Sequence, residues 1–175
     1  MDRVFRVVDS PVGLLTLVAE DERLVGLYMA DQRYRPADAE LGAEVTSGFE
    51  SLEEQLGEYF AGRLRRFDVP LRFSGTPFQE RVWTALLDIP LGETVTYGEL
   101  AQSLDMPTAS RAVGAANGRN RMSIVVPCHR VVGADGSLTG YAGGVERKRQ
   151  LLSLEEATAE SLAVSVDGSR LSAAA

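Results

Sequence analysis

The sequence of 175 residues contains one cysteine and one histidine. A single cysteine excludes an internal disulfide and a cysteine-rich zinc site. With a single histidine, carboxylates would have to supply most ligands of any zinc ion, so we expect no structural metal. The two residues are neighbours, Cys128 and His129, which makes this pair the first candidate for a chemical site.

Long apolar runs are also absent. No stretch of 18 apolar residues occurs, as a membrane-spanning helix would require, and the opening MDRVFRVVDS lacks the apolar core of a signal peptide. We therefore expect a cytoplasmic protein without membrane contact. The 45% of hydrophobic and 25% of charged residues exclude collagen-like, coiled-coil and disordered chains.

Positive charge is in deficit overall, because the formal net charge is -7. This argues against a generic nucleic-acid-binding protein. The segment 106–150 is an exception, since it carries seven arginine and lysine residues against two acidic ones, and it includes Cys128. Such a segment is compatible with a small phosphate-binding surface; a chance fluctuation on a solvated face is the alternative.

The first 75 residues predict a small α+β domain with an antiparallel sheet and one helix. Short apolar runs between turn residues predict strands, and large apolar residues at helical spacing predict the helix. The expected elements are strands at 4–8, 13–18 and 23–29, a helix at 47–61 and a possible strand at 68–73. We attach no chemistry to this half, and 74–76 makes a plausible linker.

The second half opens with clear helix signals. Thr76-Pro77-Phe78-Gln79 and Thr96-Tyr97-Gly98-Glu99 both have the form of a capping box. The expected helices are 76–88, 96–104 and 108–118, capped by Thr76, Thr96 and Thr108. Two short helices joined by a three-residue turn fit a helix-turn-helix, although an ordinary helical hairpin has the same pattern.

The third of these helices is built mostly from small residues around one cation, Arg111. Its face could approach another backbone closely, with Arg111 projecting from it. Tight packing against the protein core is the alternative.

The apolar run 123–126 reads as a buried strand that ends at Pro127. Cys128 then lies at the end of the strand, next to His129 and Arg130, which would favour the nucleophilic thiolate. A lone cysteine is otherwise most often buried and inert. Because neighbours on a strand point to opposite faces, a water or a turn would be needed to connect Cys128 to His129.

A partner for the histidine is available downstream. A glycine-rich loop at 140–144 leads into a helix from about 145, on which Lys148, Leu152 and Glu155 share a face. Glu155 could orient the imidazole of His129. The alternative is that Glu155 is a solvated helix charge.

Together, these motifs resemble the O6-alkylguanine-DNA alkyltransferases, the suicide DNA-repair methyltransferases. The resemblance rests on PCHRVVG, the GYAGG loop beyond it, the K-x-x-L-L-x-x-E helix, TYGELA and RAVGAAN. It covers about 76–155 closely, whereas the first half is similar only in its plan of three strands and a helix.

For the fold, the resemblance implies a ribonuclease-H-like N-terminal domain at 1–75. It also implies a mostly helical domain at 76–156 with a winged helix-turn-helix, and we expect a flexible tail at 157–175. For the partners, it implies duplex DNA containing O6-alkylguanine, a monomer with possible cooperative assembly on DNA, and no metal or organic cofactor.

For the chemistry, the resemblance implies a single irreversible transfer of an alkyl group from O6 of guanine, or O4 of thymine, to Cys128. His129 would take the thiol proton through a water, oriented by Glu155. Asn120 would brace the turn around the nucleophile. Tyr97 would contact the target phosphate and assist the leaving guanine.

For DNA binding, the resemblance implies that Arg111 fills the gap left by the flipped nucleotide. The other residues implied in DNA or base binding are Ser110, Ala112 and Gly114 on the same helix, Val131 and Ala142 through their backbone, Tyr141 in the pocket, and Lys148, which would reach the tyrosine or the loop.

The sequence departs from the family pattern at Arg121, where proline is usual, and at Ser110, where alanine is common. Three other functions stay open at this point. A protein that binds alkylated DNA without repairing it would lack the acceptor cysteine, a Cys-His hydrolase would turn over repeatedly, and a helix-turn-helix regulator would need a dimerisation element.

Overall fold

The computed structural model describes the backbone of residues 2–173 and the side chains of residues 2–164. Its first half is a four-stranded sheet in the order β3-β2-β1-β4. Strands β1 (Arg3–Val8), β2 (Leu15–Glu20) and β3 (Arg23–Met29) pair antiparallel, and the short β4 (Ala43–Glu44) runs parallel to β1. The three predicted strands are confirmed.

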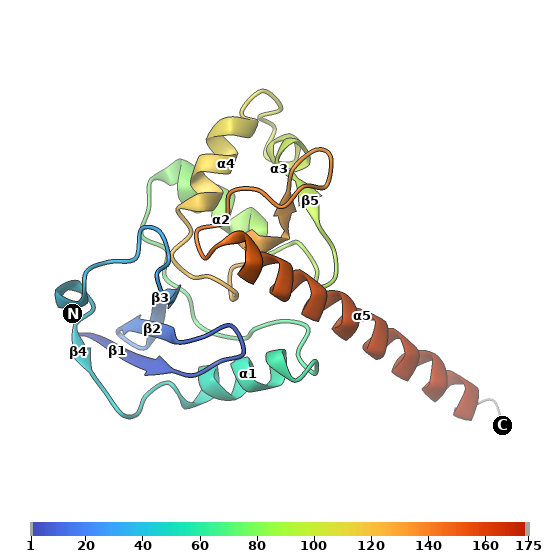
Figure 1. Ribbon diagram of the computed structural model, residues 1–175, viewed down its shortest axis with the longest axis horizontal. Coiled ribbons are helices and arrows are strands. Elements are labelled where there is room, and N and C mark those ends of the chain that lie inside the picture. Colours follow the sequence, from blue (N-terminus) through green and yellow to red (C-terminus); the bar gives the residue numbers. More distant parts are fainter. Residues whose placement is uncertain (1, 174–175) are drawn as a thin grey trace.

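Helix α1 (Glu50–Phe60) lies against this sheet (Figure 1). Its buried residues Leu52, Leu56 and Tyr59 follow the apolar spacing that predicted the helix. The possible strand at 68–73 is reduced to an isolated bridge between Leu24 and Leu71. A short 3-10 helix, η1 (Asp38–Glu40), interrupts the loop between β3 and β4.

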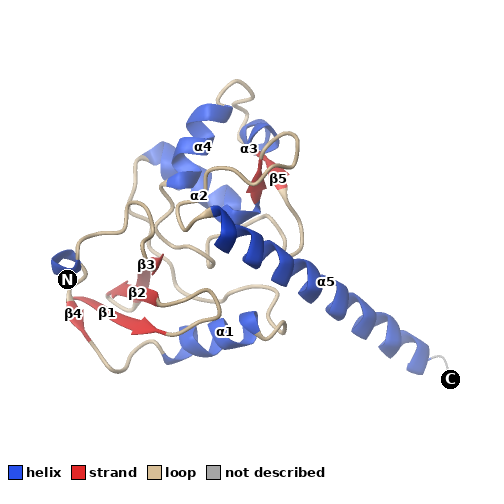
Figure 2. Ribbon diagram, viewed as in Figure 1, coloured by secondary structure: helices blue, strands red, loops and turns tan. Residues whose placement is uncertain are grey.

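The second half gathers three helices: α2 (Pro77–Leu86), α3 (Tyr97–Ser103) and α4 (Ser110–Gly118). Figure 2 shows them grouped apart from the sheet. The capping boxes at Thr76 and Thr96 are both formed. The predicted cap at Thr108 is wrong, because Ala109 occupies the N-cap of α4 and contributes no side-chain hydrogen bond.

The apolar run 123–126 is buried as predicted but is not a strand. It forms a turn in which Ile124 has a positive φ of 72°, a conformation that cannot continue a strand. The following residues form the 3-10 helix η2 (Cys128–Arg130) and the short strand β6 (Val131–Val132), which pairs parallel with β5 (Val95–Thr96). Cys128 and His129 therefore lie on a turn.

Helix α5 (Val145–Ala173) starts between the sheet and the helices of the second half and projects outward at its C-terminal end (Figure 1). It includes most of the segment 157–175, for which the sequence predicted a flexible tail. The backbone there is helical up to Ala173, and the flexibility of this segment stays a prediction. Within the described residues, we find no helix with the length and apolar content needed to cross a membrane.

One hydrophobic core joins the two halves. It contains Leu27 and Leu56 from the first half together with Trp83, Val126 and Leu151 from the second. Backbone hydrogen bonds also cross between them, because the Leu27 N–H donates to the Arg121 carbonyl and the Ser123 N–H donates to the Leu27 carbonyl. The site described next lies along this junction.

Candidate active site

Cys128 is the first residue of the 3-10 helix η2 and is 4% exposed. The Asn120 Nδ2 donates to its Sγ at 3.1 Å and to the Val126 carbonyl at 2.9 Å. The Asn120 Oδ1 accepts from the Met122 N–H at 3.0 Å. One buried asparagine thus ties together both ends of the turn that precedes the cysteine and also contacts the sulfur.

A second asparagine, Asn117, supports the same turn from helix α4. Its Nδ2 donates to the Cys128 carbonyl at 3.2 Å. The sequence did not predict a role for this residue, since nothing in the motif distinguishes it from other polar residues on α4. The helix that carries Arg111 is therefore linked directly to the backbone of the cysteine.

Cys128 is held as a thiol in the resting site. Burial raises its pKa, and the Asn120 hydrogen bond and the Lys148 charge offset this only in part. The expectation that His129 and Arg130 would favour the thiolate is wrong for this resting state, because both side chains bond to Glu155 instead.

His129 is fully buried, with its Nε2 2.6 Å from the Glu155 Oε1. Its other ring nitrogen, Nδ1, is buried and has no hydrogen-bond partner among the described residues. A carboxylate at Nε2 favours the tautomer that carries its proton there, which leaves Nδ1 free to accept one. The sequence-based pairing of His129 with Glu155 is present in the structure.

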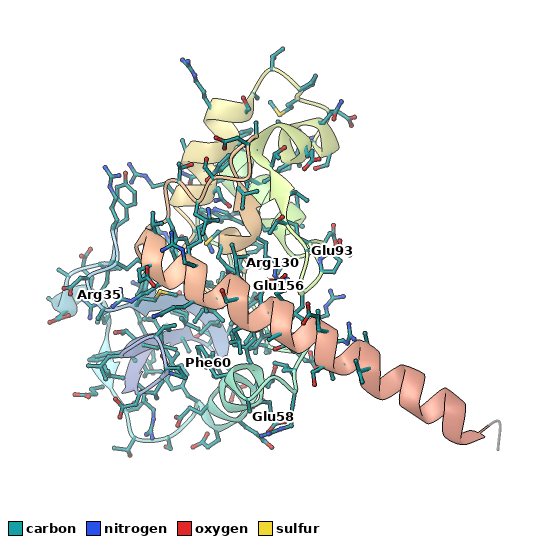
Figure 3. All side chains as sticks on the ribbon, turned by 45° about the vertical axis from the view of Figure 1, so that its right-hand side comes forward. Arg35, Glu58, Phe60, Glu93, Arg130 and Glu156 are labelled. Carbon is teal, nitrogen blue, oxygen red and sulfur yellow. The ribbon has the colours of Figure 1, made fainter. Side chains whose placement is uncertain are left out.

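Glu155 is the centre of a buried cluster. Its carboxylate accepts two hydrogen bonds from Arg130, each at 2.9 Å, and one from the Tyr59 hydroxyl at 2.7 Å. Figure 3 shows Arg130 beside α5, the helix that carries Glu155. Burial raises the pKa of Glu155, but His129 and Arg130 more than offset this and lower it to about 2. The group is therefore a carboxylate at neutral pH.

Tyr97 and Lys148 both bind the loop between β6 and α5, at the Thr139 carbonyl. The Lys148 Nζ donates to the Val131 carbonyl at 2.6 Å and to the Thr139 carbonyl at 3.3 Å, and the Tyr97 hydroxyl donates to the same Thr139 carbonyl at 3.2 Å. Of the two contacts expected for Lys148, the structure thus shows the one with the loop. Burial raises the pKa of Tyr97, and a negative charge on Cys128, once its thiol ionises, would raise it further.

The outer face of α4 carries the predicted DNA-binding residues. Arg111 and Ala112 are exposed, and Ser110 and Gly114 are half-buried. A Cβ placed on Gly114 would lie 3.5 Å from the Tyr97 ring, an ordinary van der Waals contact, so Tyr97 packs directly against this part of the helix. The geometry therefore places this face next to the Tyr97 side of the site.

The remaining predicted pocket residues are Tyr141, Ala142 and Val131. Tyr141 is half-buried and packs against the core. Burial of its hydroxyl raises its pKa well above the usual value, and an ionised Cys128 would raise it further. The Ala142 carbonyl accepts from the Arg33 N–H of the first half at 2.9 Å. Like the Val131 carbonyl, it already has one protein donor, and each oxygen keeps a second lone pair for a ligand.

Three further residues belong to the site by geometry and were not assigned to it from the sequence: Tyr59, Asn117 and the guanidinium of Arg130 as a partner of Glu155. Tyr59 carried a weak signal, since it is a polar aromatic on the apolar face of α1.

Among the described residues, no three or more histidine, cysteine, aspartate or glutamate side chains cluster in a way that could hold a metal ion.

Comparison with known proteins identifies the family. A family model of the DNA-binding domain of 6-O-methylguanine DNA methyltransferase matches residues 77–157, and a model of its ribonuclease-like domain matches residues 4–73. The second match confirms the ribonuclease-like first half expected from the resemblance.

Individual relatives agree with these models. The methylated-DNA--protein-cysteine methyltransferase of Mycolicibacterium paratuberculosis is 54% identical over 86% of this chain and 91% of its own length. The protein of that name from Methanosarcina acetivorans is 46% identical over 86% of this chain and 97% of its own.

Among solved structures, that of Mycobacterium tuberculosis OGT in complex with DNA matches with a TM-score of 0.84 at 50% identity. The match covers 89% of this chain and 94% of that chain. The resemblance read from the cysteine motif is thereby confirmed, and the chain belongs to the 6-O-methylguanine-DNA methyltransferase family.

Proposed function

We propose that this protein repairs O6-alkylguanine in duplex DNA by transferring the alkyl group irreversibly to Cys128. The observation that carries the proposal is the arrangement around the sole cysteine, whose sulfur contacts Asn120 beside a buried His129–Glu155 pair. Curated relatives that share about half of its residues are named methylated-DNA--protein-cysteine methyltransferases, which supports the same reaction here.

In the proposed reaction, the sulfur forms a bond to the alkyl carbon while the bond between that carbon and O6 breaks. The thiol proton passes to His129 Nδ1 through a water, and Glu155 stabilises the resulting imidazolium. The leaving guanine takes up a proton with the assistance of Tyr97, whose raised pKa keeps it protonated at neutral pH. The product is a thioether without a carbonyl for water to attack, so each chain reacts once.

The target atom lies inside a stacked duplex, so the nucleotide must be flipped out. Arg111 on the exposed face of α4 is suited to fill the gap, and Ser110, Ala112 and Gly114 are small enough to allow close approach. Tyr141 and the backbone of Val131 and Ala142 would receive the base, with Lys148 holding the loop. O4-methylthymine is a second substrate under this proposal.

The proposal also includes a cytoplasmic location, a monomer with possible cooperative assembly on DNA, and no metal or organic cofactor. It places the domain boundary near residue 75. The helix-turn-helix is assigned to α3 and α4, which pack against each other across the turn at 104–109.

Intact-mass measurement tests the proposal. After incubation with a duplex containing O6-methylguanine, the protein should gain one methyl group, located on Cys128, and the yield should saturate at one per chain. Cys128→Ser should lose transfer and still bind the alkylated duplex. An unchanged mass, or repeated turnover as expected of a hydrolase, would contradict the proposal, and so would full transfer by Cys128→Ser.

A further inference from the structure

The first half of the chain contributes one side chain to the cluster around Glu155. Tyr59, near the end of α1, is 2% exposed, and its hydroxyl donates to the Glu155 Oε1 at 2.7 Å. The same oxygen lies 2.6 Å from the His129 Nε2. Tyr59 and His129 therefore share one acceptor atom, although they are separated by the boundary between the two domains.

The ring of Tyr59 is fixed by its neighbours independently of the hydroxyl. Its centroid lies 5.1 Å from that of Phe60 and 5.3 Å from that of Phe67, in edge-on and tilted arrangements that aromatic pairs prefer. A phenylalanine would satisfy this packing. The hydroxyl is therefore not needed for the core, and among the described residues its hydrogen bond is to the Glu155 carboxylate.

The direction of the hydrogen bond is defined by the charges. Burial and the negative charge of Glu155 raise the pKa of Tyr59 well above its usual value, so Tyr59 stays protonated and donates. The titratable and charged groups around Glu155 come from three places: Tyr59 on α1, His129 and Arg130 on the turn η2, and Tyr141 on the loop before α5.

We propose that Tyr59 is a positioning residue for alkyl transfer, which fixes the Glu155 carboxylate and so holds the His129 imidazole with its Nδ1 free to accept the thiol proton. The role of His129 as the base rests on the function proposed above. The N-terminal domain then takes part in the chemistry through this hydroxyl.

Removing the hydroxyl has a defined electrostatic effect. Three side chains now share the negative charge of Glu155 through hydrogen bonds, and without Tyr59 the carboxylate interacts more strongly with His129. A stronger interaction with an anion favours the protonated imidazole. In Tyr59→Phe the protonation midpoint of His129 should therefore rise, and the neutral base should be available only at higher pH.

His129 is the only histidine in the sequence, so its imidazole can be titrated by nitrogen NMR without assignment. Tyr59→Phe should raise the midpoint above that of the wild type. The single-turnover rate of methyl transfer should fall about tenfold at neutral pH, since a positioned base contributes at least about a hundredfold. The acid limb of the pH–rate profile, where the rate rises as His129 loses its proton, should move to higher pH by the same amount as the midpoint.

Tyr28→Phe is the matched control, because Tyr28 is also a buried tyrosine of the sheet domain but belongs to a separate cluster with Val18, Val25 and Leu41. Its midpoint and acid limb should stay at the wild-type values. Site-specific 3-fluorotyrosine at position 59 is a stronger hydrogen-bond donor of nearly equal size. It should move the protonation midpoint of His129 to lower pH while the ring contacts are kept.

The outcomes separate this inference from the function on which it rests. If the wild-type protein transfers no methyl group, the proposed function fails whatever the NMR titration gives. If the wild type transfers and neither Tyr59 substitution moves the midpoint, the positioning role is overturned. A slower rate in Tyr59→Phe with an unmoved acid limb would also overturn it, since a purely structural loss would have that effect.

Discussion

Glu155 is a buried carboxylate whose ionisation is tied to the folded state. Its side chain is 1% exposed and accepts from Tyr59 and Arg130 while contacting His129. Its pKa of about 2 lies below its ordinary value of 4.5. A group whose pKa is lowered by folding stabilises the folded state above the ordinary pKa, and this contribution is lost as the pH falls toward the folded value.

This gives a prediction for the acid stability. The free energy of unfolding should be larger in the wild type than in Glu155→Gln at pH 7, because the variant leaves Arg130 and His129 without their anion. The difference should shrink by about 3 kcal/mol between pH 4.5 and pH 2, as the wild-type carboxylate becomes protonated. Urea unfolding at a series of pH values measures both quantities.

Glu156→Gln is the matched control, since Glu156 is the next residue on the same helix and is exposed. Its free energy of unfolding should stay within about 0.5 kcal/mol of the wild type at each pH. A constant difference between the wild type and Glu155→Gln across pH 2 to 4.5 would show that Glu155 titrates normally in the folded protein.

At the residue scale, the sequence predicted the central residues of the candidate site but not Tyr59, which binds Glu155. Cys128, His129 and Glu155 follow from adjacency and helical spacing, and the structure brings the last two together. Tyr59 could not be predicted, because its contact with Glu155 depends on how two distant elements pack. Local motifs define chemistry within an element, whereas contacts between elements arise from the fold.

At the scale of elements, helix α4 connects its exposed face, which we propose to bind DNA, to the turn that carries Cys128. The sequence predicted the helices well because capping boxes are local, as at Thr76 and Thr96. It failed at 123–126, where a short apolar run indicates burial but its periodicity alone does not identify a strand. The positive φ of Ile124 is imposed by the surrounding fold and has no local signal.

Arg111→Ala tests the role of the exposed face of α4. Transfer from duplex O6-methylguanine should slow by about tenfold or more, because the flipped nucleotide leaves a gap that costs a few kcal/mol when unfilled. Transfer from the free modified base should be unchanged, since no stack is broken. Single-turnover rates with the two substrates measure the ratio.

Arg149→Ala removes the same charge from an exposed position on α5, where Arg149 pairs with Glu146 on the surface. It should affect both substrates equally and slightly. Equal losses on the duplex and the free base in Arg111→Ala would argue against insertion into the duplex.

At the scale of the whole molecule, the two halves share one core and are expected to unfold together. Leu27 illustrates this, because it lies in β3, is fully buried, and forms backbone hydrogen bonds with Arg121 and Ser123 on the turn before the cysteine. The sequence predicted two domains from their separate patterns. It gave no indication that their interface would be continuous with the core and would contain the site.

Leu27→Ala should therefore destabilise both halves at once. Loss of a fully buried leucine costs about 2–5 kcal/mol. The sole tryptophan, Trp83, reports on the other half, where it is buried against α4 through a hydrogen bond to the Ala116 carbonyl. The free energy of unfolding from its fluorescence transition in urea should fall by the same amount as that of the sheet, measured by hydrogen exchange.

Leu14→Ala is the control, because Leu14 is exposed. It should change neither of these two free energies by more than about 0.5 kcal/mol. An unmoved Trp83 transition in Leu27→Ala would mean that the halves unfold independently, and the coupling of Tyr59 to Glu155 could then break without loss of the helical domain.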